Sequence, residues 1–465
     1  MSNHLIVVVP GIGGSVLARL GDRDDVVWDA GKRDIGDLVV RPKRMSVNEW
    51  PRLEPIGLTR STKLLGFTIV AGYERLLASL GAFGKIDGHG DPKRPVLGAD
   101  VVVAPYDFRL GVVDAAKRLD AVVNAHFGDV SEAERAGRVV VVAHSLGGLV
   151  ARQWLGVMGR WRWCRSLITL GTPHRGAPKA LDWMVNGVRV LGAPLPWPTR
   201  LLREWTSVAE LLPRYEAVTD LTAGRAVYPH ELPIPVLSTA RAAYEMHLEV
   251  ERAWTEMPRG GPEVVACLGW SHPTPDAATW DGTTLTVAPT APAWLDRTGW
   301  ENDFGDGTVP AISAVPIEMS NHQNDLIRLR ARHVPMVDTP GLVALLTRYR
   351  QRRDVGWIRG EEGTAAIGLD LPEMHAVGEP IPVTVHLRQV PSDVSRHPVF
   401  ATLTPSGDDL AEPVEVTLDW AADRRLFTGE LPGQPEGLFD VRICARAVPG
   451  AGDLSAQDTI AVVGP

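Results

Sequence analysis

The chain has 465 residues, of which 45% are hydrophobic and 22% are charged, a composition typical of a globular protein and not of a disordered one. This length exceeds that of an ordinary single domain. The formal net charge of −8 is small for the length, so it gives no reason to expect a nucleic-acid partner or an electrostatic attraction to anionic lipid.

The amino-terminal region contains the apolar run Leu5–Val9, which has no basic leader and is too short for the core of a signal peptide. It is better interpreted as a buried strand. No stretch of the sequence is long and apolar enough to span a bilayer. The three cysteines, Cys164, Cys267 and Cys444, lie far apart without metal-ligand spacing and suit a reducing compartment. We therefore expect a cytoplasmic protein with no metal and no cofactor.

Up to residue 352, runs of Val, Ile and Leu alternate with helical patterns. The clearest strands are predicted at 5–9, 100–104, 139–143, 167–170 and 264–268. Continuous apolar runs of this kind are typical of strands covered on both faces. The alternation predicts an α/β catalytic domain over 1–352, with a mostly parallel sheet flanked by helices.

Two long excursions interrupt this alternation, at about 20–75 and 175–230. Tryptophans and proline-rich apolar turns gather around the second, over 154–215. We interpret both excursions as cap insertions over the site. Ordinary core packing is the alternative, because aromatic side chains are usually buried.

The pattern changes after a charged and glycine-rich linker at 353–364. Residues 365–465 show apolar and polar side chains in alternation between Pro and Gly turns, for example at 383–388, 414–420 and 439–446. A period of two without helical stretches predicts a β-sandwich domain of immunoglobulin-like type. We regard this domain as a candidate surface for a protein partner.

The strongest motif lies at 139–150, where a run of valines leads through Ala143-His144-Ser145 into a helical pattern. A nucleophile elbow needs small residues two positions before and after the serine, because the strained turn brings those positions close together. Ala143 and Gly147 occupy them. A chance match of small-Ser-small is the alternative, and the strand-turn-helix context argues against it. Ser145 is therefore the predicted nucleophile.

An oxyanion needs two backbone N–H donors, one of them from the residue after the nucleophile, here Leu146. The glycine-rich loop at 10–15 follows the first strand, and we expect its Ile12 amide to be the second donor. A dinucleotide-binding loop is the rival interpretation. It would require glycine at the position of Val16, and Pro10 breaks the expected entry into a helix.

The acid and base of a hydrolase triad follow the serine in the order Asp, then His. Asp306, in a glycine-flanked turn, is the best-placed carboxylate, and Asp303 is the second choice. His333 lies on a loop directly before the last helix predicted in the catalytic domain, where the triad histidine normally sits. His322 is its competitor.

Taken together, these motifs resemble the lecithin:cholesterol acyltransferase family, which includes lysosomal phospholipase A2 and phospholipid:diacylglycerol acyltransferases. They cover roughly residues 5–350 in family order and read VPGIGGS at 9–15, APYDFR at 104–109, AHSLGG at 143–148, ITLGTP at 168–173, SVAELLP at 207–213 and GDGTVP at 305–310, followed by His333.

The resemblance implies an α/β-hydrolase fold with a triad of Ser145, Asp306 and His333, and with Ile12 and Leu146 at the oxyanion hole. Further candidates for substrate binding are Gly11, His144, His174 and Trp197.

The chain also departs from the family. Phe108 stands where a Trp is usual, the cap cysteine pair and secretion signal of the secreted members are absent, and the β-rich portion after residue 364 is not part of the family pattern.

The function that follows is a serine hydrolase or O-acyltransferase working through an acyl-serine, with water or an alcohol as acceptor. The resemblance and the apolar cap favour a lipid ester, a phospholipid or neutral glyceride, met at a membrane face. Two alternatives stay open. One is a small-ester carboxylesterase or thioesterase. The other is a partner-binding or effector module with secondary catalysis.

Overall fold

The computed structural model describes residues 4–29, 42–59, 72–190, 193–288, 305–320, 326–329, 331–338, 342, 345–346, 365–372, 374–388, 397–406, 412–448 and 452–463. The predicted linker at 353–364 lies outside these ranges, as do Asp303 and His322, the second choices for the acid and the base. The domain boundaries proposed above stay predictions.

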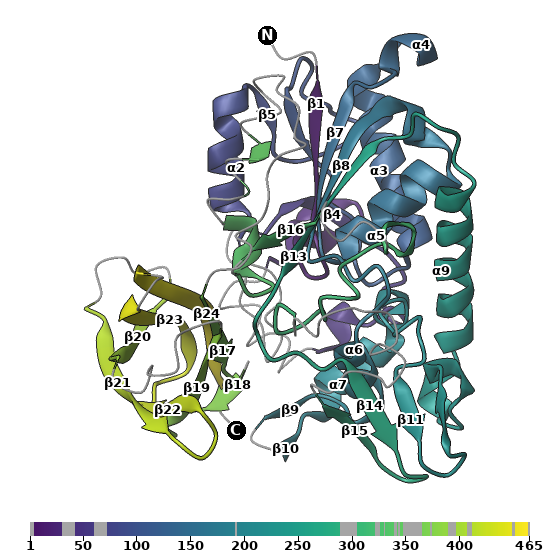
Figure 1. Ribbon diagram of the computed structural model, residues 1–465. Coiled ribbons are helices and arrows are strands. Elements are labelled where there is room, and N and C mark those ends of the chain that lie inside the picture. The colour runs from purple at the N-terminus through teal and green to yellow at the C-terminus, as the bar shows by residue number, and fades with distance from the viewer. Residues whose placement is uncertain are drawn as a thin grey trace.

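A seven-stranded sheet forms the centre of the molecule (Figure 1), and every neighbouring pair of its strands is parallel. This confirms the predicted α/β core, and each of the five predicted strands is present within a few residues of its expected bounds. In sheet order the strands are β16 (Ile327–Leu329), β13 (Glu263–Gly269), β8 (Cys164–Leu170), β7 (Val139–His144), β1 (Leu5–Val9), β6 (Val101–Val103) and β5 (Ile86–Asp87).

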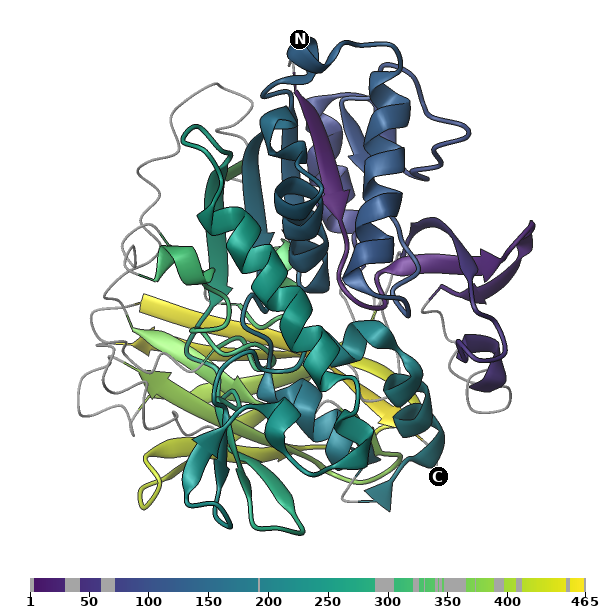
Figure 2. The same ribbon diagram turned by 90° about the vertical axis from the view of Figure 1, so that its right-hand side faces the viewer.

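Helices cover both faces of this sheet. On one face α3 (Val112–Phe127), α5 (Leu146–Arg152) and α9 (Ala240–Thr255) lie near one another, and α2 (Glu74–Leu80) lies on the other face (Figures 1 and 2). Apolar side chains of α3 recur every three or four positions and are buried against the sheet. Burial of strands on both sides explains why their sequences are continuously apolar.

The predicted cap regions form two smaller assemblies. The first is a three-stranded antiparallel sheet of β2 (Ser15–Arg19), β3 (Asp22–Trp28) and β4 (Leu53–Leu58). The second lies beyond the carboxyl ends of the central strands, at the bottom of Figure 1. It contains α6 (Pro178–Val185), α7 (Pro196–Glu204), α8 (Thr206–Ala209), the pair β9 (Arg189–Val190) and β10 (Ala193–Pro194), and the sheet of β11 (Val218–Asp220), β12 (Arg225–Val227), β14 (Ala277–Trp280) and β15 (Leu285–Ala288).

The carboxyl-terminal part is an all-β unit with a hydrophobic core of its own, separate from the parallel sheet (Figure 1). Inward side chains such as Val383 and Val385 are buried, as the period of two predicts. The immunoglobulin-like type of this unit stays a prediction. Its strands, in hydrogen-bonded order, are β17 (Ala366–Asp370), β19 (Ile381–Arg388), β22 (Leu426–Leu431), β21 (Val414–Ala421), β20 (Val399–Pro405), β23 (Gly437–Val448), β24 (Gly452–Val463) and β18 (Met374–Ala376).

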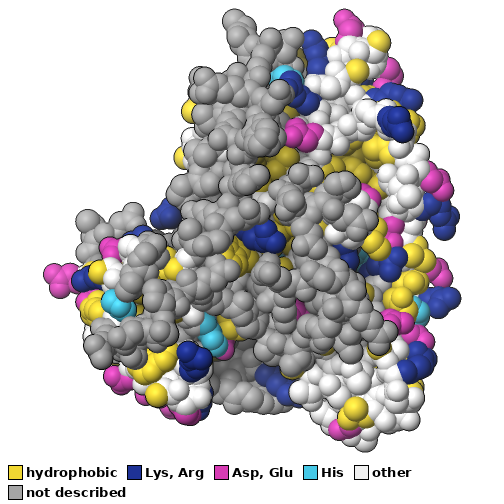
Figure 3. Space-filling view, viewed as in Figure 1, with side chains coloured by type: hydrophobic (Ala, Val, Ile, Leu, Met, Phe, Trp, Pro, Cys, Tyr) yellow, Lys and Arg dark blue, Asp and Glu magenta, His cyan; other side chains and the backbone are white. Residues whose placement is uncertain are grey.

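The surface carries charges of both signs. On the face shown in Figure 3, basic and acidic side chains alternate along the right-hand edge, and hydrophobic side chains reach the surface nearer the centre. Within the described residues, none of the helices is both long and apolar enough to cross a bilayer.

The segment after β6 is organised by a buried ion pair. The Arg109 guanidinium contacts both carboxylate oxygens of Asp107, at 2.8 and 2.7 Å, and both side chains are almost fully buried. Asp107 also accepts the backbone N–H of Leu53, and Arg109 donates to the backbone carbonyl of Trp50. The pair thus holds the 42–59 segment against the central sheet.

Phe108, which stands where the family usually has a Trp, lies between two indole rings. Its ring meets those of Trp28 and Trp205 edge to face, at centroid distances of 5.6 and 5.5 Å. Such aromatic contacts add to the stabilisation from buried area. The departure from the family pattern is therefore accommodated in a closely packed aromatic cluster.

Glu210, in the second predicted cap region, accepts a hydrogen bond from the amino-terminal end of helix α3. Its carboxylate accepts the backbone N–H of Val112 at 2.7 Å, in the first turn of the helix. The side chain is buried, and desolvation raises the pKa of this carboxyl to about 7, although the Val112 N–H opposes the shift. A buried carboxyl of this kind makes the stability of the fold depend on pH.

We predict that Arg109→Met lowers the free energy of unfolding by about 3–5 kcal/mol, because it leaves the Asp107 carboxylate buried without its counter-ion. Chemical denaturation measures this change. Arg52→Met is the control, since Arg52 is exposed and its ion pair with Asp114 is long at 3.4 Å. Equal effects of the two substitutions would contradict the role given to the buried pair.

We also predict that Glu210→Gln changes the pH dependence of stability. The folded-state pKa lies above the unfolded one, so the stabilisation by this group is present at low pH and is lost as pH rises through about 7. Between pH 4 and pH 8, the free energy of unfolding of the wild type should fall by up to about 3 kcal/mol relative to that of the amide variant. Denaturant titrations at both pH values measure it, and a difference that stays constant with pH would refute the assignment.

Candidate active site

Ser145 lies in a sharp turn between β7 and α5, with φ of 52° and ψ of −127°. A residue with a side chain rarely adopts a positive φ, and this strained geometry is typical of a nucleophile elbow. Small neighbours are required because other backbone segments come very close. A Cβ atom added at Gly147 would lie 2.4 Å from the Pro10 carbonyl oxygen, and one at Gly148 would lie 2.0 Å from Thr172 Oγ1.

The structure brings Ser145, His333 and Asp306 together although they come from three separate loops. His333 Nε2 lies 2.9 Å from Ser145 Oγ, and His333 Nδ1 lies 2.7 Å from Asp306 Oδ2. An ionised carboxylate can only accept, so Nδ1 carries the imidazole proton and Nε2 is left to accept the serine hydroxyl proton. The three side chains are buried, with residue exposures of 6%, 7% and 1%.

Asp306 is held by its own glycine-flanked turn. Its Oδ1 accepts the backbone N–H groups of Thr308 and Val309, at 2.9 and 2.6 Å, while Oδ2 receives His333 Nδ1–H. Burial raises the pKa of the Asp306 carboxyl, but the His333 imidazole and the two N–H groups together outweigh it, so the net shift is downward. Asp306 is therefore an ionised, immobilised acceptor for the imidazole.

The glycine-rich loop after β1 lies directly beside Ser145. A Cβ atom at Gly11 would come within 2.9 Å of Ser145 Cβ. Ile12 follows in the same loop, and Leu146 opens α5 immediately after the serine. The two predicted oxyanion donors are thus on segments that flank Ser145.

Tyr106 holds this glycine-rich loop through two hydrogen bonds. Its hydroxyl donates to the Pro10 carbonyl at 2.8 Å, and its backbone N–H donates to Ser15 Oγ at 3.0 Å. The side chain is fully buried, and burial raises the pKa of its phenol. Tyr106, in the 104–109 motif, therefore stabilises the position of the loop that carries Ile12.

Tyr73 was missed by the sequence reasoning and joins the two sides of the site. Its oxygen accepts the Gly11 N–H at 2.9 Å and lies 3.0 Å from His144 Nδ1. His144 Nε2 lies 3.1 Å from the His333 carbonyl oxygen, which can only accept. Nε2 therefore carries the proton, and Nδ1 accepts from the Tyr73 hydroxyl. Burial lowers the pKa of His144 to about 3, so this ring is a neutral link between the Gly11 loop and the His333 loop.

The other predicted binding residues lie in different surroundings. His174 is buried with Nε2 3.3 Å from Thr169 Oγ1 on β8, and burial holds its pKa well below the ordinary value. Trp197 belongs to α7 in the cap and is half-buried against the hydrophobic core. Their roles in substrate binding stay predictions. Within the described ranges, no cluster of three or more His, Cys, Asp or Glu side chains is arranged to hold a metal ion.

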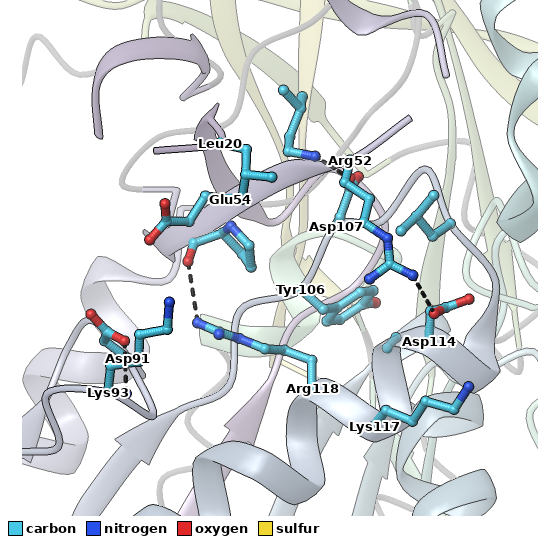
Figure 4. A pocket seen from close by; sticks show the side chains of 14 residues that line it. Leu20, Arg52, Glu54, Asp91, Lys93, Tyr106, Asp107, Asp114, Lys117 and Arg118 are labelled. Atoms are coloured by element: carbon cyan, nitrogen blue, oxygen red, sulfur yellow. Dashed lines mark hydrogen bonds and ion pairs between the residues drawn. The ribbon is translucent and has the colours of Figure 1, made fainter. Parts of the chain in front are cut away.

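A cavity of about 430 Å³ is lined by residues of β4 and α3 together with Tyr106, Asp107 and Leu110 (Figure 4). Its charged lining is partly paired: Arg52 meets Asp114 at 3.4 Å, and Arg118 donates to the carbonyl oxygens of Pro55 and Gly90. The triad side chains do not line this cavity. It is therefore a feature distinct from the triad.

Gly171, at the end of β8, is a second position that the sequence reasoning did not single out. Its φ is 55°, and an added Cβ atom would lie 2.9 Å from Asp306 Oδ2 and 3.0 Å from His333 Nδ1. The glycine hydrogens thus face the hydrogen bond between the predicted acid and base. The strand-ending segment at 168–173 contains the signal, since a glycine there is required by backbone conformation and by space.

The parallel sheet and the sharp turn at Ser145 between β7 and α5 are those of the α/β-hydrolase fold. Residues 95–241 match the lecithin:cholesterol acyltransferase family, which confirms the resemblance drawn from the motifs. The chain thus has an α/β-hydrolase fold and is similar to that family. The matched segment runs from just before β6 into α9 and contains Ser145, while Asp306 and His333 lie after it.

Three of the similar solved structures have low TM-scores. The lipase BlEst2 of Bacillus licheniformis, in propeptide form, is 11% identical, with 75% of this chain and 83% of that chain covered and a TM-score of 0.26. A superoxide reductase (neelaredoxin) from Ignicoccus hospitalis is 17% identical, with 21% and 80% covered and a TM-score of 0.18. The CARDB domain of the PF1109 protein from Pyrococcus furiosus is 12% identical, with 22% and 94% covered and a TM-score of 0.15. TM-scores this low support no conclusion. No curated protein matches the chain in sequence.

We predict that Gly171→Ala slows any reaction of Ser145 by at least ~10-fold, because the new methyl group would push apart the side chains of Asp306 and His333. The rate of labelling by a fluorophosphonate measures it. Gly128→Ala is the matched control: its φ of 54° imposes a similar backbone strain, but nothing lies within 4 Å of the added atom. Equal labelling rates in the two variants would show that the contact with the triad has no effect.

Proposed function

We propose that this protein is a serine-dependent acyl-ester hydrolase or O-acyltransferase that acts on lipid esters. The fold and the family match support the broader class, an acyl-ester hydrolase or acyltransferase. The observation that carries the serine mechanism is the continuous hydrogen-bond path from Ser145 Oγ through the His333 imidazole to Asp306.

In the proposed first half-reaction, Ser145 Oγ attacks the ester carbonyl carbon while His333 Nε2 takes the hydroxyl proton. Asp306 keeps the imidazole in the required tautomer and stabilises its protonated form. The tetrahedral oxyanion is stabilised by the N–H groups of Ile12 and Leu146, each worth about 3 kcal/mol of barrier. The protonated imidazole then gives its proton to the leaving alcohol, and the acyl group stays on Ser145.

The second half-reaction repeats these steps with a different nucleophile. His333 removes a proton from water or from an acceptor alcohol, whose oxygen attacks the acyl-serine carbonyl. Collapse of the second oxyanion restores the Ser145 hydroxyl and releases either a fatty acid or a new ester. Exclusion of water by the cap would favour the alcohol.

A lipid substrate is supported by the family match and by the apolar character of the cap. Trp183, Val185, Leu195 and Trp197 of the α6–α7 region are half-buried, so part of each apolar surface is accessible. Apolar surface of this kind, beyond the carboxyl ends of the strands, suits acyl chains and contact with a membrane face. We propose that the protein meets its substrate there, from the cytoplasmic side.

The test is an incubation of total lipid extract with wild type and with Ser145→Ala, followed by lipid mass spectrometry. Loss of the nucleophile should reduce turnover on the order of 10⁶-fold. New lysolipids in the wild-type sample indicate phospholipase activity, and new acyl esters indicate transfer. Ser238→Ala, at an exposed serine, is the control that should behave as wild type.

Two outcomes would overturn the proposal. Turnover of short p-nitrophenyl esters without any change in the lipid extract would identify a small-ester carboxylesterase or thioesterase. If an alkyl fluorophosphonate fails to label the purified wild type at Ser145, the serine mechanism is wrong, and a partner-binding or effector module takes its place.

A further inference from the structure

The loop that carries His333 is fastened to the carboxyl-terminal all-β unit through the preceding residue. The Arg332 Nε lies 2.7 Å from Asp458 Oδ2 on β24, and its Nη1 donates to the Leu369 carbonyl on β17 at 2.6 Å. Both charged side chains are buried, with exposures of 8% and 3%. Two strands of the all-β unit therefore hold the guanidinium next to the predicted base.

The Arg332 guanidinium also touches the turn of Asp306. A Cβ atom added at Gly307 would lie 2.8 Å from Arg332 Nη2, so the guanidinium rests against this glycine. Lys179 Nζ donates to the Gly307 carbonyl on the other side, at 3.3 Å. Arg332 thus contacts Gly307, the residue after the predicted acid, and directly precedes the predicted base in the chain.

A second set of hydrogen bonds ties β17 to the same region. Leu369 N–H donates to His272 Nδ1 at 3.1 Å, and His272 N–H donates to the Gly305 carbonyl at 3.1 Å. The hydroxyl of Ser271 donates to the Ile367 carbonyl at 3.2 Å. The turn before Asp306 is therefore linked to the all-β unit through the segment that follows β13.

Apolar contact makes the junction continuous. Ala366 of β17 is fully buried in one hydrophobic cluster with Leu268 and Trp270 from the end of β13 and with Val309 and Val315 after Asp306. A shared core of this kind resists relative movement of its parts. The all-β unit therefore packs directly against the loops of the predicted acid and base.

The Asp458 side chain is buried on β24. A buried carboxylate in a strand is unfavourable unless it is paired. Asp458 Oδ2 meets Arg332. The carboxylate is therefore directed at the catalytic side of the junction, where it neutralises a buried guanidinium.

We propose that Arg332 and Asp458 are positioning residues for the triad, and that the all-β unit acts through them to hold His333 and the Asp306 turn in register with Ser145. This inference rests on the proposed serine mechanism. Its physical basis is the steep dependence of rate on geometry, since a misplacement of about 1 Å can cost ~100-fold.

The experiment compares full-length Asp458→Asn, Arg332→Gln and the double variant with wild type, using a short p-nitrophenyl ester. Sites are counted by fluorophosphonate labelling, so that kcat refers to competent molecules, and the thermal midpoint is recorded for each protein. We expect Asp458→Asn to lower kcat about 10- to 100-fold with KM changed less than about twofold, and to slow labelling by the same factor. The double variant should lose less than the product of the single effects, because the two side chains act as one unit.

Asp440→Asn is the matched control. Asp440 lies on β23 opposite Thr459, next to Asp458, but it is exposed and its carboxylate meets Ser406 and Thr459. The same chemical change there should leave kcat and labelling rate within twofold of wild type.

The outcomes separate this inference from the proposed function. If wild type is neither labelled nor active, the serine mechanism itself fails. If wild type is active and Asp458→Asn keeps wild-type kcat per labelled site, the positioning role is wrong. A lowered thermal midpoint with unchanged kcat would likewise show that the ion pair only stabilises the fold.

Discussion

The candidate site depends on how closely backbone segments approach one another at the carboxyl edge of the parallel sheet. The elbow at Ser145 can form only because Gly147 lets the chain after β1 come within contact of α5, and because Gly11 fits against the serine Cβ. Gly171 does the same beside Asp306 and His333. Side chains from three loops meet within hydrogen-bond distance because these positions carry none. The glycines are thus a steric condition for the triad geometry.

Close approach alone would leave the loops free to shift, and buried hydrogen bonds remove that freedom. Tyr106 holds the Pro10 carbonyl, and Tyr73 holds Gly11 and, through neutral His144, the backbone of His333. Because these groups are buried, leaving any of them unpaired would cost more than the bond itself gains. The arrangement therefore favours one geometry strongly over its neighbours, which is what preorganisation of an active site requires.

The sequence was most informative where a function depends on neighbouring residues. The elbow around Ser145 combines a strand, small residues and a helix within twelve positions, so both the fold and the predicted nucleophile follow from local pattern and order. Asp306 and His333 were identified by order and by family motif, and the structure brings them together with Ser145. Tyr73 could not be identified in this way. Its partners Gly11 and His144 lie 62 and 71 residues away, and a tyrosine before a short helix carries no signal of its own.

The junction at Arg332 likewise carries no signal in the sequence, because its partners Leu369 and Asp458 lie far from it along the chain. The family match ends at residue 241, so it includes the predicted nucleophile but not the predicted acid or base. The all-β unit, which is not part of the family pattern, contacts the catalytic part near those two residues, through Arg332 and through Ser271 and His272 after β13. The part of the triad beyond the match is thus the part that the additional unit supports. In this chain, strands that follow Asp306 and His333 in sequence add to the support of the loops that carry them, and the all-β unit is structurally continuous with the candidate catalytic site.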